Sequence, residues 1–129
     1  MSTYAPSRST AAYRESSILT APPERLVVML YDGARRFLYQ AAIAMREERH
    51  AESDARLRRA ELIIEELLAT LDLEAGGEIA ANLQGLYVFF LRHLSEARGE
   101  RDADKLDWVN AQLGELRESW AKIGAAAAA

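Results

Sequence analysis

The hydrophobic positions of this chain recur at helical spacing over most of its length. In the last third, apolar residues from Leu106 to Ile123 follow one another at intervals of three and four, which places them along one side of a helix. Three upstream segments carry similar stripes, and no strand-like alternation competes with them. The pattern therefore predicts long amphipathic helices that bury their apolar sides against one another.

Residues with special backbone preferences mark the expected helix ends. Pro23 can open the first helix, because proline is tolerated in a first helical turn, and the Gly76-Gly77 pair separates the second helix from the third. Gly99 stands where a left-handed residue would end the third helix, and Asp102 or Asp104 can cap the fourth. The expected helices span about residues 23–47, 53–71, 78–98 and 104–124.

Short connections between long helices favour antiparallel neighbours. The predicted fold is therefore all-α, an antiparallel up-down-up-down four-helix bundle over residues 18–124. A flexible N-terminal arm, residues 1–17, precedes it, and an alanine tail, residues 125–129, follows it. Tyr13, Ile18 and Leu19 are the expected anchors of the arm. The third helix is expected to bury Ile79, Leu83, Leu86, Tyr87, Phe90, Leu91 and Leu94.

The composition narrows the function classes. The chain has 129 residues, half of them hydrophobic, which suits one domain with a proper core. A net charge of -4 argues against a nucleic-acid binder, and the absence of cysteine excludes disulfides and thiolate zinc sites. No secretory leader and no membrane-length apolar run is present, so we expect a cytoplasmic protein that binds neither nucleic acid nor membrane.

Several large apolar residues fall away from the core stripe of their own helix when each residue turns the helix by about 100°. One such residue means little, but several can join into a patch that marks a partner surface. The natural ligand of a groove between helices is another amphipathic helix. The alternative is that a central helix or the arm covers these side chains. The hypothesised client-binding surface consists of Val28, Tyr39, Ile43, Leu62, Val88, Phe89 and Trp108.

Catalytic and metal-binding patterns are weak. Glu47 and His50 form the only Glu-x-x-His pair, whereas a di-iron bundle needs two such pairs. His93 lacks the neighbouring lysine expected of a phosphotransfer histidine, and no glycine-rich phosphate loop is present. We therefore expect a non-enzyme without metal or cofactor, and a generic four-helix interaction or phosphotransfer module is the alternative.

Three stretches together carry a family signature. They are Thr20–Leu26 with Met29–Ala34, Gly76–Tyr87, and Leu106–Ile123, and Tyr13 precedes them as a tyrosine of the N-terminal arm. This combination resembles the FliS family of flagellin export chaperones over about residues 13–123.

The chain departs from the family pattern at three places. Pro22 stands where the family usually has serine, so the usual side-chain cap of the first helix is absent. Near the end of the third helix, the chain reads Arg92-His93-Leu94 and Ala97-Arg98, and Trp108 occupies a position that is more often polar. The last two departures suggest adaptation to a particular partner.

The resemblance implies a small cytoplasmic chaperone built as an antiparallel helical bundle. Such proteins bind the C-terminal helical segment of flagellin, prevent its premature polymerisation and deliver it to the flagellar type III export apparatus. The resemblance also implies that the arm covers part of the binding surface when flagellin is absent. Further implied partners are the export-gate protein and, in some members, an anti-sigma factor. An uncovered apolar groove would also favour a homodimer of the empty chaperone.

Overall fold

The computed structural model describes residues 23–128, with side-chain surroundings from residue 24 to residue 122. The helices are α2 (Pro23–Arg46), α3 (His50–Ala69), α4 (Leu73–Glu100) and α5 (Ala103–Ala128). The predicted arm lies outside the described residues, and the proposed domain limits stay a prediction. Among the described helices, none combines the length and the hydrophobicity that a membrane span requires.

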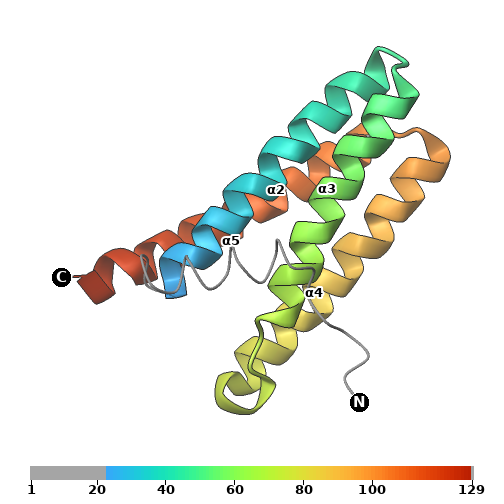
Figure 1. Ribbon diagram of the computed structural model, residues 1–129. Helices are drawn as coiled ribbons and strands as arrows, with labels where there is room; N and C mark the ends of the chain where they lie inside the picture. The colour runs from blue at the N-terminus through green and yellow to red at the C-terminus, as the bar shows by residue number, and fades with distance from the viewer. Residues whose placement is uncertain (1–22, 129) are drawn as a thin grey trace, which may run out of the picture.

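The four helices form the predicted all-α bundle. Helix α2 packs against α3 and α5, and α4 packs against the same two helices from the opposite side. Consecutive helices run in opposite directions, so the chain passes up and down around a square (Figure 1). The contacts between α4 and α5 are the sparsest of the four pairs, so α4 is the helix least enclosed by its neighbours.

The bundle is wider at one end than at the other. The pair α2–α5 and the pair α3–α4 lie close together near the α2–α3 and α4–α5 turns, and they diverge toward the start of α2 and the end of α5 (Figure 1). Residues from both pairs line an apolar cavity at the diverging end. The divergence therefore leaves apolar side chains that the helices do not cover among themselves.

The core follows the predicted stripes of α2, α3 and α5. Tyr31, Leu38, Leu57 and Leu113 have almost no exposed surface, because each points toward the axis of the bundle. Leu116 and Trp120 pack on the core while remaining partly exposed. Full burial of one such large side chain is worth about 1.5–3 kcal/mol, so these stripes supply most of the driving force for packing.

Helix α4 differs from its prediction at both ends. It begins at Leu73, before the expected start, because the Asp72 carboxylate accepts a hydrogen bond from the Ala75 N–H and caps the first turn. Gly77 then kinks the helix, with φ of 54° and ψ of −131°, a conformation open to glycine alone. The left-handed residue at the C-terminal end is Arg101, with φ of 54°, so the prediction for Gly99 was wrong.

Two residues predicted to lie in the core of α4 are exposed. Ile79 is 73% exposed and Leu86 is 41% exposed, so both predictions were wrong. A helix that packs closely against two neighbours buries a broad stripe of apolar residues. Helix α4 makes few contacts with α5, so part of its apolar side stays open. The buried stripe of α4 is correspondingly narrow and consists of Ala80, Leu83, Tyr87, Phe90, Leu94 and Ala97.

The remaining helix limits shift by a few residues. Helix α3 begins at His50, three residues before the expected Ser53, and α5 continues to Ala128, beyond the expected end near Gly124. The Asp102 carboxylate accepts a hydrogen bond from the Asp104 N–H at 3.1 Å, which confirms Asp102 as the cap of α5. These differences leave the architecture unchanged.

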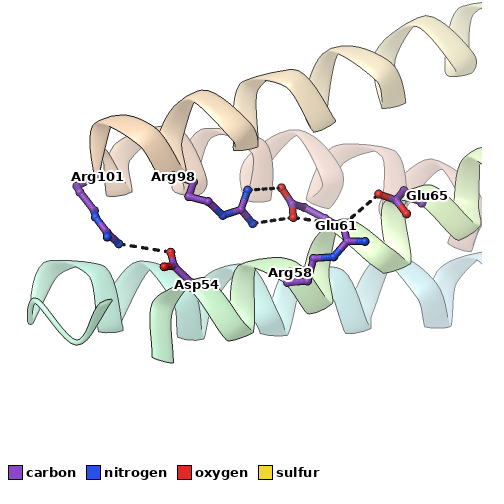
Figure 2. Close-up of polar contacts among 6 residues, drawn as sticks. All are labelled: Asp54, Arg58, Glu61, Glu65, Arg98 and Arg101. Atoms are coloured by element: carbon purple, nitrogen blue, oxygen red, sulfur yellow. Dashed lines mark hydrogen bonds and ion pairs between the residues drawn. The ribbon is translucent and has the colours of Figure 1, made fainter. Parts of the chain in front are cut away.

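A row of charged side chains joins α3 to α4. Arg98 donates two hydrogen bonds to Glu61, from Nη2 to Oε1 at 2.7 Å and from Nη1 to Oε2 at 3.0 Å (Figure 2). Glu61 is only 6% exposed, so its carboxylate depends on this guanidinium for much of its solvation. Arg101 and Asp54 form an exposed pair farther along the same interface. These pairs add polar contacts between α3 and the C-terminal end of α4.

Candidate functional site

The side chains of the hypothesised client-binding surface are mostly open to solvent. Val28 is the exception, because it is partly buried on α2. The other six are exposed by 37–61%: Tyr39, Ile43, Leu62, Val88, Phe89 and Trp108. Met29, Ile79 and Leu86, which the hypothesis left out, are also exposed. The described bundle therefore does not cover these apolar side chains, and their role in binding stays a prediction.

Two of these residues meet across the α4–α5 interface. The rings of Phe89 and Trp108 lie edge to face with their centroids 5.8 Å apart. His93 completes the cluster, because it stacks on Phe89 at 5.5 Å and meets Trp108 at 5.2 Å. The core residue Phe90 also contacts this cluster, because its ring lies edge to face with that of Trp108 at a centroid distance of 6.2 Å. The structure thus assembles an exposed aromatic cluster that a partner can contact.

The remaining residues of the hypothesised surface are not part of this aromatic cluster. Tyr39 and Ile43 are one turn apart on α2, Leu62 points outward from α3, and Val88 lies on α4. No ring contact in the described part of the chain joins any of them to the aromatic cluster. The residues of the hypothesised surface are therefore distributed over all four described helices.

The cavity at the diverging end was not predicted from the sequence. It has a volume of about 750 Å³ and lies between the start of α2, the end of α3, the start of α4 and α5. Its walls are mainly apolar and include Leu26, Val27, Ile79, Leu83 and Trp120. The only sequence signal for it was the Gly76-Gly77 pair, because the kink at Gly77 directs the first turn of α4 along the rim.

Two buried tyrosines connect the core to this cavity. The hydroxyl groups of Tyr31 and Tyr87 share a hydrogen bond, and Tyr87 lines the cavity. Burial raises the pKa of Tyr31, and hydrogen bonds from Tyr87 and the Trp120 indole partly offset that rise. Burial, the charge that Tyr31 would carry and the hydrogen bond to Tyr31 all raise the pKa of Tyr87. Both phenols therefore stay neutral while the bundle is folded near neutral pH.

His93 is held within the aromatic cluster. The imidazole of His93 is packed between two aromatic rings, is 20% exposed, and has Glu96 as its nearest charged partner at 3.8 Å. A phosphotransfer histidine needs an open ring, so this packing disfavours that alternative. Among the described residues, no group of three His, Asp or Glu side chains could hold a metal ion.

Comparison with known proteins decides the family. The model of the flagellar protein FliS family matches residues 6–127. The chain belongs to the FliS family. The flagellar secretion chaperone FliS of Salmonella typhimurium is 36% identical over 110 residues, covering 84% of this chain and 82% of that protein.

Other FliS-family relatives give the same result. The flagellar secretion chaperone FliS of Campylobacter jejuni is 35% identical over 112 residues, covering 87% of this chain and 88% of that protein. The flagellar secretion chaperone FliSB of Pseudomonas aeruginosa is 38% identical over 106 residues, covering 82% of this chain and 84% of that protein. The family resemblance is therefore confirmed, and the chain is a flagellar secretion chaperone by family.

One departure from the FliS pattern has a structural explanation. Arg98, part of the departure at Ala97-Arg98, forms the paired hydrogen bonds with the buried Glu61. Its presence thus serves the α3–α4 contact, and no external partner is needed to explain it. The arm anchors Tyr13, Ile18 and Leu19, and the unusual Pro22, lie outside the described residues, so their roles stay predictions.

Proposed function

We propose that this FliS-family chain is a cytoplasmic, flagellin-specific secretion chaperone without enzymatic activity. It binds the C-terminal helical segment of flagellin, prevents premature polymerisation, and delivers flagellin to the flagellar type III export apparatus. The single observation that carries the proposal is the set of large apolar side chains that stay exposed outside a well-packed core. A bundle that only needed to fold would have little reason to keep them.

The arrangement of the patches supports a client that wraps around the bundle. Tyr39 and Ile43 lie on α2, Leu62 lies on α3, and the Phe89–Trp108 pair joins α4 and α5. One short straight helix would reach only some of them, whereas an extended, partly helical segment can contact them in turn. A disordered client orders as it binds, so part of the contact energy is spent on that ordering.

The arm supplies a proposed means of regulation. Tyr13, Ile18 and Leu19 are apolar anchors that precede the first turns of α2, and Leu26 and Val27 in those turns line the apolar cavity. We infer that the arm covers part of the client surface until flagellin displaces it, which is a shift between two populations. The empty chaperone would have the same exposed patches available for a homodimer.

Other proposed partners follow from the family. The export-gate protein would receive the loaded chaperone, and an anti-sigma factor is a further partner in some members. We place neither of them on particular residues. Chaperone action of this kind requires only binding and release, so it needs no cofactor.

Binding of flagellin by the purified full-length chain tests the proposal directly. Calorimetry should detect binding of full-length flagellin monomer and of a peptide from its C-terminal helical segment. Flagellin lacking that segment is the matched control and should not bind. Equal binding of the truncated flagellin would overturn the assignment of the client segment.

Deletion of residues 1–17 tests the role of the arm. The bundle should stay folded, as judged by helical circular dichroism, and its affinity for the flagellin peptide should change. The direction of the change is open, because Tyr13 could contact the client as well as the groove. Unfolding of the truncated chain, or an unchanged affinity, would show that the arm is not a regulatory cover.

A further inference from the structure

The outer face between α2 and α3 combines exposed apolar and basic side chains. Met29, Arg36 and Ile43 occur every seven residues on α2 and are all exposed. Seven residues are almost two helical turns, so these side chains form one row with steps of about 10.5 Å. The row therefore alternates apolar, cationic and apolar groups along the outside of the helix.

The register of α3 places two of its exposed residues level with this row. Gly33 lies so close to Ile63 that a Cβ on Gly33 would be 3.2 Å from the Ile63 Cδ1. Four residues farther along, the Arg59 guanidinium lies over the Phe37 ring, 5.7 Å from its centroid. This antiparallel register places Arg36 level with the stretch from Arg59 to Leu62. Arg59 and Leu62 are both exposed, and Leu62 is 48% exposed.

The two arginines on this face keep their charge available. Neither Arg36 nor Arg59 forms an ion pair with any carboxylate of the described residues. Asp32, the nearest acidic residue on the outer face of α2, is already held by Arg117 at 2.9 Å. On α3, Glu66 follows Leu62 by one turn but is only 6% exposed. The face is therefore locally cationic on a chain whose net charge is -4.

We propose that this face, the arginine-flanked face of Met29, Arg36, Ile43, Arg59 and Leu62, selects an acidic amphipathic helix within the client segment. The inference rests on the proposed function and names the chemistry that the client must carry. Apolar residues of the bound helix lie over Met29, Leu62 and Ile43. Aspartate or glutamate residues beside that apolar side lie within reach of the two guanidinium groups.

Charge complementarity decides the occupant. An uncharged or basic helix would leave two guanidinium groups partly desolvated and unpaired, which costs free energy. Charge-assisted hydrogen bonds from arginine to carboxylate are stronger than neutral ones and favour an acidic partner. Arg59 is also held in place by the ring of Phe37, so less side-chain freedom is lost when it binds.

The test compares two peptides on the full-length chain. The first is the C-terminal helical segment of flagellin from the same organism, and the second is the same peptide with every Asp and Glu replaced by Asn and Gln. The protein carries Arg36→Gln and Arg59→Gln together. Arg92→Gln is the matched control, because Arg92 is an exposed arginine on α4 that forms no ion pair within the described residues.

The double substitution should weaken binding of the acidic peptide about tenfold at low salt. The loss should shrink to about twofold or less at about 0.5 M salt, where screening is strong. The neutral peptide should bind wild type and the double variant equally, which also shows that the variant is folded. Arg36→Lys with Arg59→Lys should restore most of the affinity, and Arg92→Gln should change nothing.

Three results would contradict the inference in distinguishable ways. If wild type binds neither peptide, the proposed function fails and the inference falls with it. If wild type binds the acidic peptide but the double variant binds it equally well, only the inference is wrong. If the double variant loses the same affinity for both peptides, the arginines act through folding or packing and not through charge.

Discussion

The hydroxyl groups of Tyr31 and Tyr87 meet across the diagonal of the bundle and join α2 to α4. Their rings are tilted by 53° with centroids 6.4 Å apart, and the two hydroxyl oxygens share a buried hydrogen bond. The main helix packing runs around the sides of the square, so this polar contact ties together two helices that are not direct neighbours. Tyr87 also lines the cavity, so this hydrogen bond lies where the two helix pairs diverge.

Tyr31→Phe should destabilise the bundle. The substitution keeps the ring but leaves the Tyr87 hydroxyl without its hydrogen-bond partner. An unsatisfied buried polar group costs about 1–3 kcal/mol. Urea unfolding followed by circular dichroism measures the change. A stability equal to that of wild type would mean that the diagonal hydrogen bond contributes nothing.

The same pair should make stability fall at alkaline pH. The folded-state pKa of both tyrosines is raised by burial, whereas an exposed tyrosine ionises near pH 10. Above about pH 10 the unfolded chain loses protons that the folded chain keeps, so stability declines by up to about 1.4 kcal/mol per pH unit for each tyrosine. The contribution is fully present below that pH. Unfolding of wild type and of Tyr31→Phe/Tyr87→Phe at several pH values should show a flatter profile for the variant.

Arg98→Ala should cost about 1–3 kcal/mol, because it removes both hydrogen bonds to the buried Glu61 carboxylate and leaves only the ion pair with Arg58 at 3.6 Å. Asp54→Asn is the matched control on the same interface. It breaks the ion pair between Asp54 and Arg101, whose side chains are each 43% exposed. This substitution should cost less than about 0.5 kcal/mol. Thermal and urea unfolding measure both changes. Equal losses would show that burial of Glu61 is not what makes the pair important.

Two glycines of α4 should respond in opposite directions to alanine. Gly77 has φ of 54° and ψ of −131°, so Gly77→Ala should destabilise by about 1–3 kcal/mol. Gly85 has helical geometry and no neighbour within 4 Å of an added Cβ, so Gly85→Ala should stabilise by about 0.5–1 kcal/mol. Unfolding free energies decide the matter. A stable Gly77→Ala variant would mean that the kink can straighten at little cost.

Core and surface substitutions should separate stability from binding. Leu113 is fully buried, so Leu113→Ala should cost about 2–5 kcal/mol. Tyr39 is 61% exposed, so Tyr39→Ala should change stability by less than about 0.5 kcal/mol but weaken binding of the flagellin peptide. Melting curves and calorimetry on the same samples give both quantities. Loss of stability in both variants would show that Tyr39 belongs to the core.

The sequence by itself determined the helical class and most of the core. Helical spacing of apolar residues identified the stripes of α2 and α5, and Pro23 marked the start of α2. These features are local, because a helix is closed by hydrogen bonds between residues four apart and shows its buried side in its own periodicity. The exposure of Tyr39, Leu62, Phe89 and Trp108 was predicted for the same reason.

Tertiary structure decided how much of each stripe is covered. Ile79 and Leu86 carry the periodicity of buried residues, yet both are exposed because the helix pairs diverge and α4 meets α5 only sparsely. The kink at Gly77 and the cavity beside it depend on the same divergence. Periodicity reports which side of a helix is apolar and carries no information about the distance to the neighbouring helix.

Tertiary structure also decided which polar groups meet. Glu61 and Arg98 are 37 residues apart, and Tyr31 and Tyr87 are 56 apart. Many other charged residues on α3 and α4 could have paired equally well on sequence grounds. The choice depends on the rotation and register of packed helices, which many small apolar contacts set together. Local sequence thus determined the helices and their apolar sides, while packing determined the contacts between them and the surfaces left open to a client.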